Sequence, residues 1–353
     1  MLIAAPLDRL GWSAFYSQQL TLEDLSAGFP ARVCSVQRSQ LTVLCERGSL
    51  DVVLPPHLVT GVEGSIAIGD WLLIEHEAPR VLRVLKRRSL ISRMAAGVEQ
   101  RMQAIAANLD TLFVVTSCND DFNLSRLERY FTVARHAQVE TVVVLTKADL
   151  CADTESFAAE ARSIAHDIAV LALNATEHAA ADALVPWLAY GQTVAFVGSS
   201  GVGKSTLVNA LLAKKAQATG GIREHDAKGR HTTTSRQMFA LPSGAWVIDT
   251  PGVRELKLGS VAAAVSEVFD DIEALAQNCR FRDCQHRDDA GCALHAAVAA
   301  GQLDARRLSS YQKLQREAER ASQSLHERRA IERRWGRMHR HIISKRGPGT
   351  PRG

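Results

Sequence analysis

The stretch GSSGVGKST, from Gly198 to Thr206, decides the fold of the central part of this chain. It follows the apolar run TVAFV and leads into STLVNALLA, so it joins a buried strand to a helix, as a phosphate-binding P-loop must. In the pattern G-x-x-x-x-G-K-[ST], backbone N–H groups converge on the β-phosphate, Lys204 neutralises phosphate oxygens during catalysis, and Ser205 holds Mg²⁺. We expect the whole loop to bind the nucleotide: Gly198, Ser199, Ser200, Gly201, Val202, Gly203, Lys204, Ser205 and Thr206.

A second short motif, TKAD from Thr146 to Asp149, follows the apolar run TVVVL and predicts a guanine-reading loop. Asp149 can accept two hydrogen bonds from guanine that adenine cannot donate, and the stem of Lys147 can lie along the purine. Thr146 stands where Asn is more usual. The side-chain amide of that Asn normally connects the base loop to the phosphate loop by a hydrogen bond, so the sequence does not decide whether this connection is present. The alternative for four such residues is a solvated turn. Candidates for reading guanine are Thr146, Lys147, Ala148 and Asp149, with Asn174 and Ala175 of the later segment LNA adding a backbone contact.

DTPG, from Asp249 to Gly252, follows the apolar run AWVI and predicts a nucleotide-sensing switch. Asp249 would reach Mg²⁺ through water, and the Gly252 N–H would bond the γ-phosphate during catalysis. An ordinary turn is the alternative. Between the P-loop and this motif lies GRHTTTS, where one threonine should complete the Mg²⁺ shell; we take Thr233 as the candidate without excluding Thr232 or Thr234.

The base loop precedes the phosphate loop, whereas an ordinary G protein has them in the opposite order. Joining the usual chain ends and opening new ones after DTPG gives this order while leaving the three-dimensional site unchanged. The sequence therefore predicts a circularly permuted GTPase, in which the switch runs directly into the C-terminal region.

Hydrophobic patterning predicts a multidomain α/β protein. The chain has 353 residues, 46% of them hydrophobic, enough for two or three domains. Short β-like runs between Ala31 and Leu85 predict a small antiparallel barrel, of OB or SH3 type. Continuous apolar runs alternating with helix-length segments then predict a parallel sheet covered on both faces. We divide the chain into an OB-like barrel domain (1–90), a permuted GTPase domain (91–258) and a helical zinc-binding domain (259–353).

Cysteine spacing in the last region predicts a metal site. Of seven cysteines, three lie close together beside a histidine, in the pattern C-x4-C-x-H-x5-C. Three thiolates and one imidazole complete a tetrahedral Zn²⁺ shell with no open position, so we expect one structural zinc. Unrelated buried cysteines are the alternative, and His295 is a substitute for the histidine. The predicted ligands are Cys279, Cys284, His286 and Cys292.

The charge pattern points to polyanions and away from membranes. The net charge is only +4, but eight Lys/Arg face two Glu between His326 and Arg346, so this run, with Arg333 and Arg334, is a candidate for RNA phosphate contact. A solvated helix face is the alternative. The N-terminus MLIAAPLDRLGW lacks a basic leader and is interrupted by Asp8 and Arg9, so we expect neither a signal peptide nor a membrane span. The grouped cysteines indicate metal binding rather than disulfides, which predicts a reducing, cytoplasmic location.

Together, the barrel-like region, TKAD, GSSGVGKS, the threonine segment, DTPG and the Cys/His pattern resemble the ribosome small-subunit-dependent GTPase family (RsgA/YjeQ-like) over nearly the whole chain. The linker text RRSLISR…QAIAANLD is also similar to that family. The resemblance implies an OB-fold, a permuted GTPase domain, a zinc domain and late maturation of the small (30S) ribosomal subunit. It also implies contact with 16S rRNA and hydrolysis of GTP to GDP stimulated by that subunit. We expect a monomer.

Val253 occupies the place after DTPG where many GTPases carry the glutamine that orients water. Valine cannot position water, so slow intrinsic turnover is expected, with a replacement group from elsewhere. His231 in GRHTTT is the candidate for this catalytic role, although it could equally be a solvated loop residue or a cation that contacts phosphate.

Three rival functions stay open at this stage. A permuted GTPase could act on a protein or membrane partner without the ribosome. A non-enzymatic RNA-binding module is opposed by the intact Lys204, Ser205 and Asp249, and an ATP-dependent kinase is opposed by Asp149.

Overall fold

A computed structural model describes residues 6–37, 40–53, 66–94, 102–165, 167–219, 236–249, 262–287 and 289–322. The strands are β1 (Gly28–Val36), β2 (Gln40–Cys45), β3 (Gly48–Val53), β4 (Trp71–Glu75), β5 (Val81–Val84), β6 (Leu90–Met94), β7 (Met102–Ala107), β8 (Thr111–Ser117), β9 (Glu140–Thr146), β10 (Ala169–Ala172), β11 (Thr193–Val197), β12 (Arg236–Ala240) and β13 (Trp246–Asp249). The α-helices are α1 (Ala14–Ser17), α2 (Leu22–Ala27), α4 (Leu124–His136), α5 (Thr154–Arg162), α6 (His178–Ala183), α7 (Lys204–Thr219), α8 (Ala262–Val268), α9 (Asp270–Ala276), α10 (Ala293–Ala299) and α11 (Ala305–Ser322). Short 3₁₀ turns are η1 (Leu7–Leu10), η2 (Ala148–Leu150) and η3 (Val185–Trp187).

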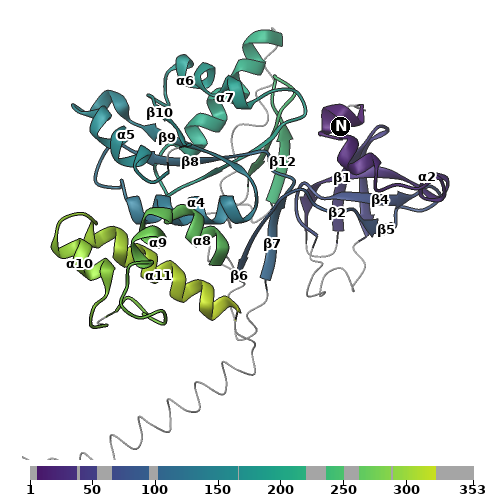
Figure 1. Cartoon of the computed structure of the whole chain (residues 1–353). Helices are drawn as coiled ribbons and strands as arrows, with labels where there is room; N and C mark the ends of the chain where they lie inside the picture. The colour runs from purple at the N-terminus through teal and green to yellow at the C-terminus, as the bar shows by residue number, and fades with distance from the viewer. Residues whose placement is uncertain are drawn as a thin grey trace, which may run out of the picture.

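Strands β1 to β5 form the predicted barrel, which we call the barrel unit (Figure 1). β1 pairs antiparallel with both β2 and β4, β2 pairs with β3, and β4 pairs with β5. A parallel bridge between Val53 and Arg80 then connects the end of β3 to the start of β5 and closes the ring. The order β3-β2-β1-β4-β5, closed by a parallel contact between the ends of β3 and β5, is the Greek-key arrangement of an OB-fold and favours that barrel type.

The central sheet, which we call the α/β unit with its helices, has five parallel strands in the order β10-β9-β8-β11-β13. Alternate residues of each strand enter different cores because side chains alternate across a sheet. Leu112 and Val114 of β8 pack on the side of α4 and α5, whereas Phe113 and Val115 pack on the side of α6 and α7. All seven residues of β8 are buried. The prediction of a parallel sheet covered on both faces is confirmed.

Local signals position the helices that cover this sheet. Helix α4 begins after Asn123, whose side chain accepts a hydrogen bond from the Arg126 N–H at 2.9 Å. Helix α5 has the same arrangement, with the Asp153 carboxylate and the Ser156 N–H 3.0 Å apart. These caps fix where each connecting loop ends and therefore where the loops at the carboxyl end of the sheet lie.

The barrel unit and the α/β unit share one sheet. β12 pairs antiparallel with β13 on one side and with β1 on the other, through Ser35–Gln237 and Val36–Arg236. The result is an 11-stranded sheet that runs from β10 through β12 into the barrel. The separate hairpin of β6 and β7 also touches the barrel, through the bridge between Ile68 and Ala106.

Helices α8 to α11, which we call the helical unit, lie beneath the central sheet, where α8 and α11 pack against α4 (Figure 1). A charged network lies in this contact. Glu128 of α4 is fully buried, and its carboxylate accepts hydrogen bonds of 3.1 Å from Arg306 and Arg307 of α11. Arg307 also donates to Asp271 of α9 at 2.7 and 2.8 Å. Two guanidinium groups thus compensate the charge of the buried Glu128.

Candidate functional site

The P-loop has the geometry that its sequence predicts. Gly198 follows β11 with φ of 140°, and a Cβ there would lie 2.0 Å from the Val115 carbonyl oxygen, so only glycine fits. The loop then turns into α7, which begins at Lys204. The Lys204 ammonium folds back over the loop and donates to the Gly198 carbonyl at 2.9 Å and to that of Ser199. Of the other predicted loop residues, Val202 is buried, Ser199 and Gly203 are half-buried, and Ser200, Gly201, Ser205 and Thr206 are exposed.

Thr146 joins the base loop to the P-loop. This residue is fully buried at the end of β9, and its hydroxyl lies 2.7 Å from the Val202 carbonyl oxygen and 3.1 Å from that of Thr116. A hydroxyl has one proton, so it donates to one of these oxygens at a time. The tie that the sequence left open is therefore present, with a threonine hydroxyl in place of an amide.

Exposure to solvent increases along the rest of the base loop, from Lys147 to Asp149. Lys147 adopts a left-handed conformation with φ of 57° and opens the 3₁₀ turn that carries Asp149. Asp149 is exposed, whereas Lys147 and Ala148 are half-buried. The left-handed backbone of Lys147 turns the chain sharply after β9. Asp149, two residues later, therefore lies at the edge of the sheet where the parallel strands end.

The segment from Leu173 to Ala175 lies beside both loops. The Ala148 N–H donates to the Leu173 carbonyl at 3.4 Å, and a Cβ on Gly203 would lie 3.6 Å from the Ala175 Cβ. The Asn174 amide oxygen accepts from the Thr176 N–H at 3.0 Å, so that side chain shapes its own turn. Phosphate loop, base loop and this third segment thus meet at one place, although they are far apart in sequence.

Asp249 is the last residue of β13, which runs parallel to β11 with Ala195 opposite Ile248. Its main chain is therefore at the same edge of the sheet as the P-loop. The other predicted site residues lie outside the described residues: His231, Thr233 and Gly252. The neighbours Thr232, Thr234 and Val253 and the basic run from Arg328 to Arg346 also lie outside them.

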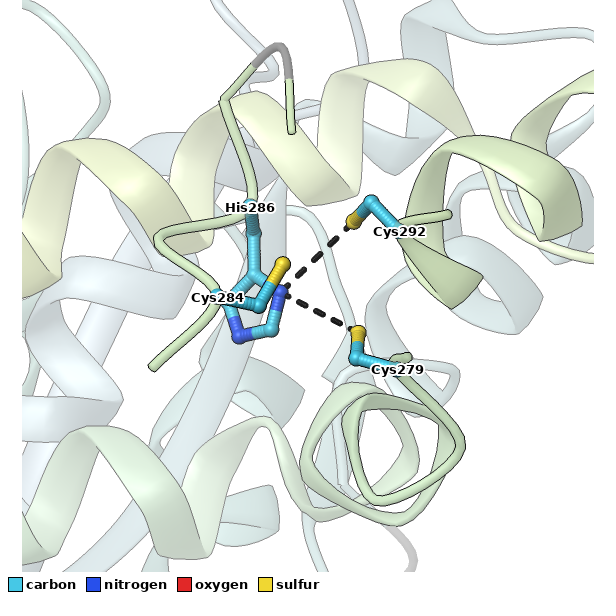
Figure 2. A group of neighbouring side chains, drawn as sticks. All are labelled: Cys279, Cys284, His286 and Cys292. Atoms are coloured by element: carbon cyan, nitrogen blue, oxygen red, sulfur yellow. Dashed lines mark hydrogen bonds between the residues drawn. The ribbon is translucent and has the colours of Figure 1, made fainter. Parts of the chain in front are cut away.

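The four predicted metal ligands converge in the helical unit (Figure 2). The ligand atoms of Cys279, Cys284, His286 and Cys292 all lie within 4.8 Å of one another. His286 Nδ1 is 3.6 Å from Cys279 Sγ and 3.7 Å from Cys292 Sγ. Zinc bonds of about 2.3 Å to sulfur and about 2.0 Å to nitrogen place tetrahedral ligands at about this separation. The cluster can hold one zinc ion, and its closed donor set is that of a structural site.

Neighbouring groups orient the metal ligands. His295 does not replace His286; its ring nitrogen lies 3.2 Å from the His286 carbonyl oxygen. The Ala293 N–H donates to Cys279 Sγ at 3.3 Å. Asp289 accepts from the backbone N–H groups of Arg287 and Gln285, which lower the pKa of its carboxyl group and keep it ionised at neutral pH. Such outer contacts fix ligand orientation.

Sequence reasoning missed the charged contact between α4 and the helical unit. Partial burial raises the pKa of Asp271, but its hydrogen bonds with Arg307 lower that pKa by more, so the net shift is downward. The pKa of Arg307 is raised, because its carboxylate partners outweigh its burial. One signal was readable: Glu128 lies between Leu127 and Phe131 on the apolar face of α4, where a charge needs a buried partner.

Comparisons with known proteins agree with this geometry. The RsgA GTPase family model matches residues 84–259. The small ribosomal subunit biogenesis GTPase RsgA 2 of Vibrio vulnificus is 47% identical over 338 residues, which cover 96% of this chain and 95% of the relative. The small ribosomal subunit biogenesis GTPase RsgA of Mesorhizobium japonicum is 46% identical over 308 residues, 86% of this chain and 88% of the relative.

Two solved structures have the same fold. YjeQ from Thermotoga maritima aligns with a TM-score of 0.59 and 22% identity, covering 82% of this chain and 98% of that one. YloQ, described as a circularly permuted GTPase, aligns with a TM-score of 0.55 and 19% identity, covering 84% and 97%. The order of base loop and phosphate loop along this chain is therefore that of a circularly permuted GTPase.

An ABC transporter model also matches residues 187–335. That range contains the P-loop but begins after the base loop, and a P-loop alone binds phosphates without choosing the base. No helix in the described ranges is both long and apolar enough to cross a membrane. The long, near-complete matches above decide the assignment: this chain belongs to the RsgA GTPase family.

Proposed function

We propose that this protein is a GTPase that assists biogenesis of the small ribosomal subunit and hydrolyses GTP to GDP and phosphate. The observation that carries the proposal is the meeting of P-loop and base loop through Thr146 and Val202, in a chain 47% identical to a small ribosomal subunit biogenesis GTPase. Binding of the 30S subunit, contact with 16S rRNA, a monomeric state and a cytoplasmic location belong to the same proposal.

The GTP site follows from the loops. Asp149 would read the guanine edge, Lys147 would cover its face, and Ala148 with the Asn174–Ala175 segment would give backbone contacts. Lys204 and the N–H groups of Gly198 to Thr206 would hold the phosphates. GTP hydrolysis in this family uses Mg²⁺, which neutralises phosphate charge; Ser205, Thr233 and, through water, Asp249 would hold it.

Catalysis would depend on residues that sense the γ-phosphate. Gly252 would donate its N–H to that phosphate, and His231 would orient the attacking water in the place of the glutamine that Val253 excludes. His231→Ala should leave GTP affinity nearly unchanged and slow subunit-stimulated hydrolysis; unchanged stimulated turnover would remove His231 from the mechanism.

We also propose the division into a barrel domain (1–90), a GTPase domain (91–258) and a zinc-binding helical domain (259–353). The barrel of β1 to β5, the parallel sheet and the Cys/His cluster support it, while the pairing of β1 with β12 couples the first two domains.

The deciding experiment measures GTP and ATP hydrolysis by the zinc-loaded protein, alone, with small ribosomal subunits and with large subunits as the control. We expect strong stimulation of GTP hydrolysis by small subunits only. Equal stimulation by both subunits, or by neither while GTP binding is intact, would contradict the proposed partner. Hydrolysis of ATP at the GTP rate would contradict the role of Asp149.

A variant pair tests the loop junction. Thr146→Ala removes a buried hydrogen bond and should weaken GDP binding about tenfold, whereas Thr146→Asn should restore it. Thr141→Ala, on the same strand but far from the loops, is the matched control. Titration of a fluorescent GDP analogue gives the affinities, and equal affinity of Thr146→Ala and the control would show that this tie does not shape the site.

A further inference from the structure

A cavity lies far along the chain from the GTP loops, between the N-terminal helices and the barrel unit. Its volume is about 400 Å³, within the range of small-ligand sites. Every residue lining it falls between Leu7 and His76, so neither the P-loop nor the base loop contributes. The elements around it are the N-terminal α1 and α2, strand β1, the turn between β2 and β3, and the end of β4 (Figure 1).

Aromatic rings and a guanidinium group line this cavity. Phe29 of β1 is half-buried, and its ring lies 5.6 Å from that of His76, with 39° between the planes. The Arg47 guanidinium lies 5.0 Å from the centre of the Phe29 ring. Trp12, a further lining residue, is held edge-on against Trp71 at 4.7 Å. Flat aromatic and guanidinium surfaces of this kind stack with nucleobases.

Two charged side chains at the mouth have capacity for a ligand. Glu46 and Arg47, in the turn between β2 and β3, are exposed and line the cavity. Across the ranges that the structure describes, neither has an ion-pair or hydrogen-bond partner. His76, in contrast, is already tied to the Leu25 carbonyl at 3.2 Å. A carboxylate can accept from the amino group of a base, and a guanidinium can bind phosphate.

We propose that this cavity binds one unpaired base of single-stranded RNA. The base takes the place of the Arg47 guanidinium over the Phe29 ring, Glu46 accepts a hydrogen bond from the amino group of the base, and Arg47 moves to contact the adjoining phosphate. Adenine, cytosine and guanine carry such an amino group and uracil does not, so these three bases are preferred over uracil. This inference rests on the proposed function, in which the partner is a ribosomal subunit.

The test uses the full-length, zinc-loaded protein with excess GDP and Mg²⁺, so that the GTP site is filled. Fluorescein-labelled tetranucleotides of A, C, G and U are titrated and followed by fluorescence anisotropy. Phe29→Leu should weaken binding of the A, C and G tetranucleotides about tenfold, and Phe29→Tyr, which keeps a ring, should bind as the unaltered protein does. Phe15→Leu is the matched control, because Phe15 is exposed on α1 and does not line the cavity.

Two charge variants sharpen the test. Glu46→Gln should reduce the preference for A, C and G over U, and Arg47→Gln should reduce the salt dependence of binding by about one phosphate contact. Failure of all four tetranucleotides to bind, or equal losses in Phe29→Leu and Phe15→Leu, would overturn the proposal. GTPase stimulation by small subunits is measured separately on the unaltered protein. The proposal of a base-binding cavity can therefore be contradicted while the proposed function stands, and the proposed function can be contradicted while the cavity still binds the tetranucleotides.

Discussion

The α/β unit has two neighbours, and it is joined to them by different forces. On the barrel side the contact is main chain: β12 and β1 pair in one sheet, and the buried Arg32 donates to the carbonyl oxygens of Leu10, Gly69 and Asn108 at 2.5 to 3.3 Å. On the helical side a shared apolar core, which includes Phe131 of α4 and Phe269 and Tyr311 of the helical unit, is combined with a network of charged side chains centred on the buried Glu128. The two sides therefore resist different perturbations.

The two contacts differ in rigidity. A backbone ladder and neutral carbonyl acceptors fix the barrel by geometry and respond little to salt. Burial lowers the pKa of Arg32 to about 10, so its guanidinium still stays charged at neutral pH. Carboxylate–guanidinium pairs instead depend on every partner being present, since removing one leaves a buried charge uncompensated. Of the two contacts, the one on the helical side is therefore the one that a change of charge should weaken more.

Loss of the metal should have the largest effect, and it should be confined to the helical unit. Cys284→Ala removes one of four zinc ligands, and structural zinc supplies about 10 kcal/mol or more to the folding of small sites. We expect loss of bound zinc and fast hydrogen exchange in α10 and α11, with GDP binding retained. Cys151→Ala, at a half-buried cysteine outside the cluster, is the control. An equal rise in the hydrogen-exchange rates of β1 and β12 would show that the contacts on the barrel side and on the helical side are not independent.

Glu128→Gln should come next. It removes the negative charge that Arg306 and Arg307 share, at a cost of about 3 kcal/mol, or about a 100-fold faster exchange of α11 amides. Arg135→Ala is the control on the same helix, because its exposed pair with Asp167 contributes less than about 1 kcal/mol. A change in Glu128→Gln no larger than in this control would refute the central role of the buried carboxylate.

Arg32→Lys tests the barrel side. Lysine cannot reach three carbonyl oxygens in a fixed fork, so at least one buried acceptor loses its donor, at about 2 kcal/mol. Exchange of the β1 and β12 amides should accelerate by about 30-fold, equally at 0.1 and 1 M salt. A strong salt dependence would mean that charge, and not geometry, holds this joint. Arg47→Lys, at an exposed turn of the same barrel, is the control.

The smallest expected effect is at the edge of the helical joint. Arg129 and Glu317 pair at 2.7 Å but are 21% and 29% exposed, so their contribution should be below about 1 kcal/mol and should fall with salt. A double-mutant cycle with Arg129→Ala and Glu317→Ala, read from exchange in α11, measures it. A coupling energy as large as the effect of Glu128→Gln would mean that the Arg129–Glu317 pair contributes as much to this contact as the buried Glu128 does.

Much of the molecule was readable from local patterns. The apolar runs predicted β9, β11 and β13 to within a residue or two, because strands covered on both faces lack polar positions. The Cys/His spacing predicted all four members of the metal cluster, since close spacing in sequence constrains distance in space. The P-loop, likewise, is a local structure that its glycines determine.

The long-range features were not readable. No local sequence pattern predicts that Ser35 pairs with Gln237, or that the Arg32 guanidinium reaches the Asn108 carbonyl oxygen. These contacts depend on how whole units of the fold pack together. Thr146 shows a subtler limit: a residue that departs from the usual type can still make the contact, here to Val202, through a different donor. Whether a given side chain at position 146 can make this contact depends on where the neighbouring backbone oxygens lie in the folded protein.

The pairing of β1 with β12 also has a consequence for how the chain folds during synthesis. Ser35 and Gln237 are roughly 200 residues apart, and bacterial-type elongation of about 5–20 residues per second separates their synthesis by about 10–40 s. During that interval this end of β1 has no partner on the side that β12 will occupy, and an open strand edge can pair with another chain. The last step of assembling the shared sheet is therefore late and non-local, and it is the step at which newly made copies are most exposed to association with one another.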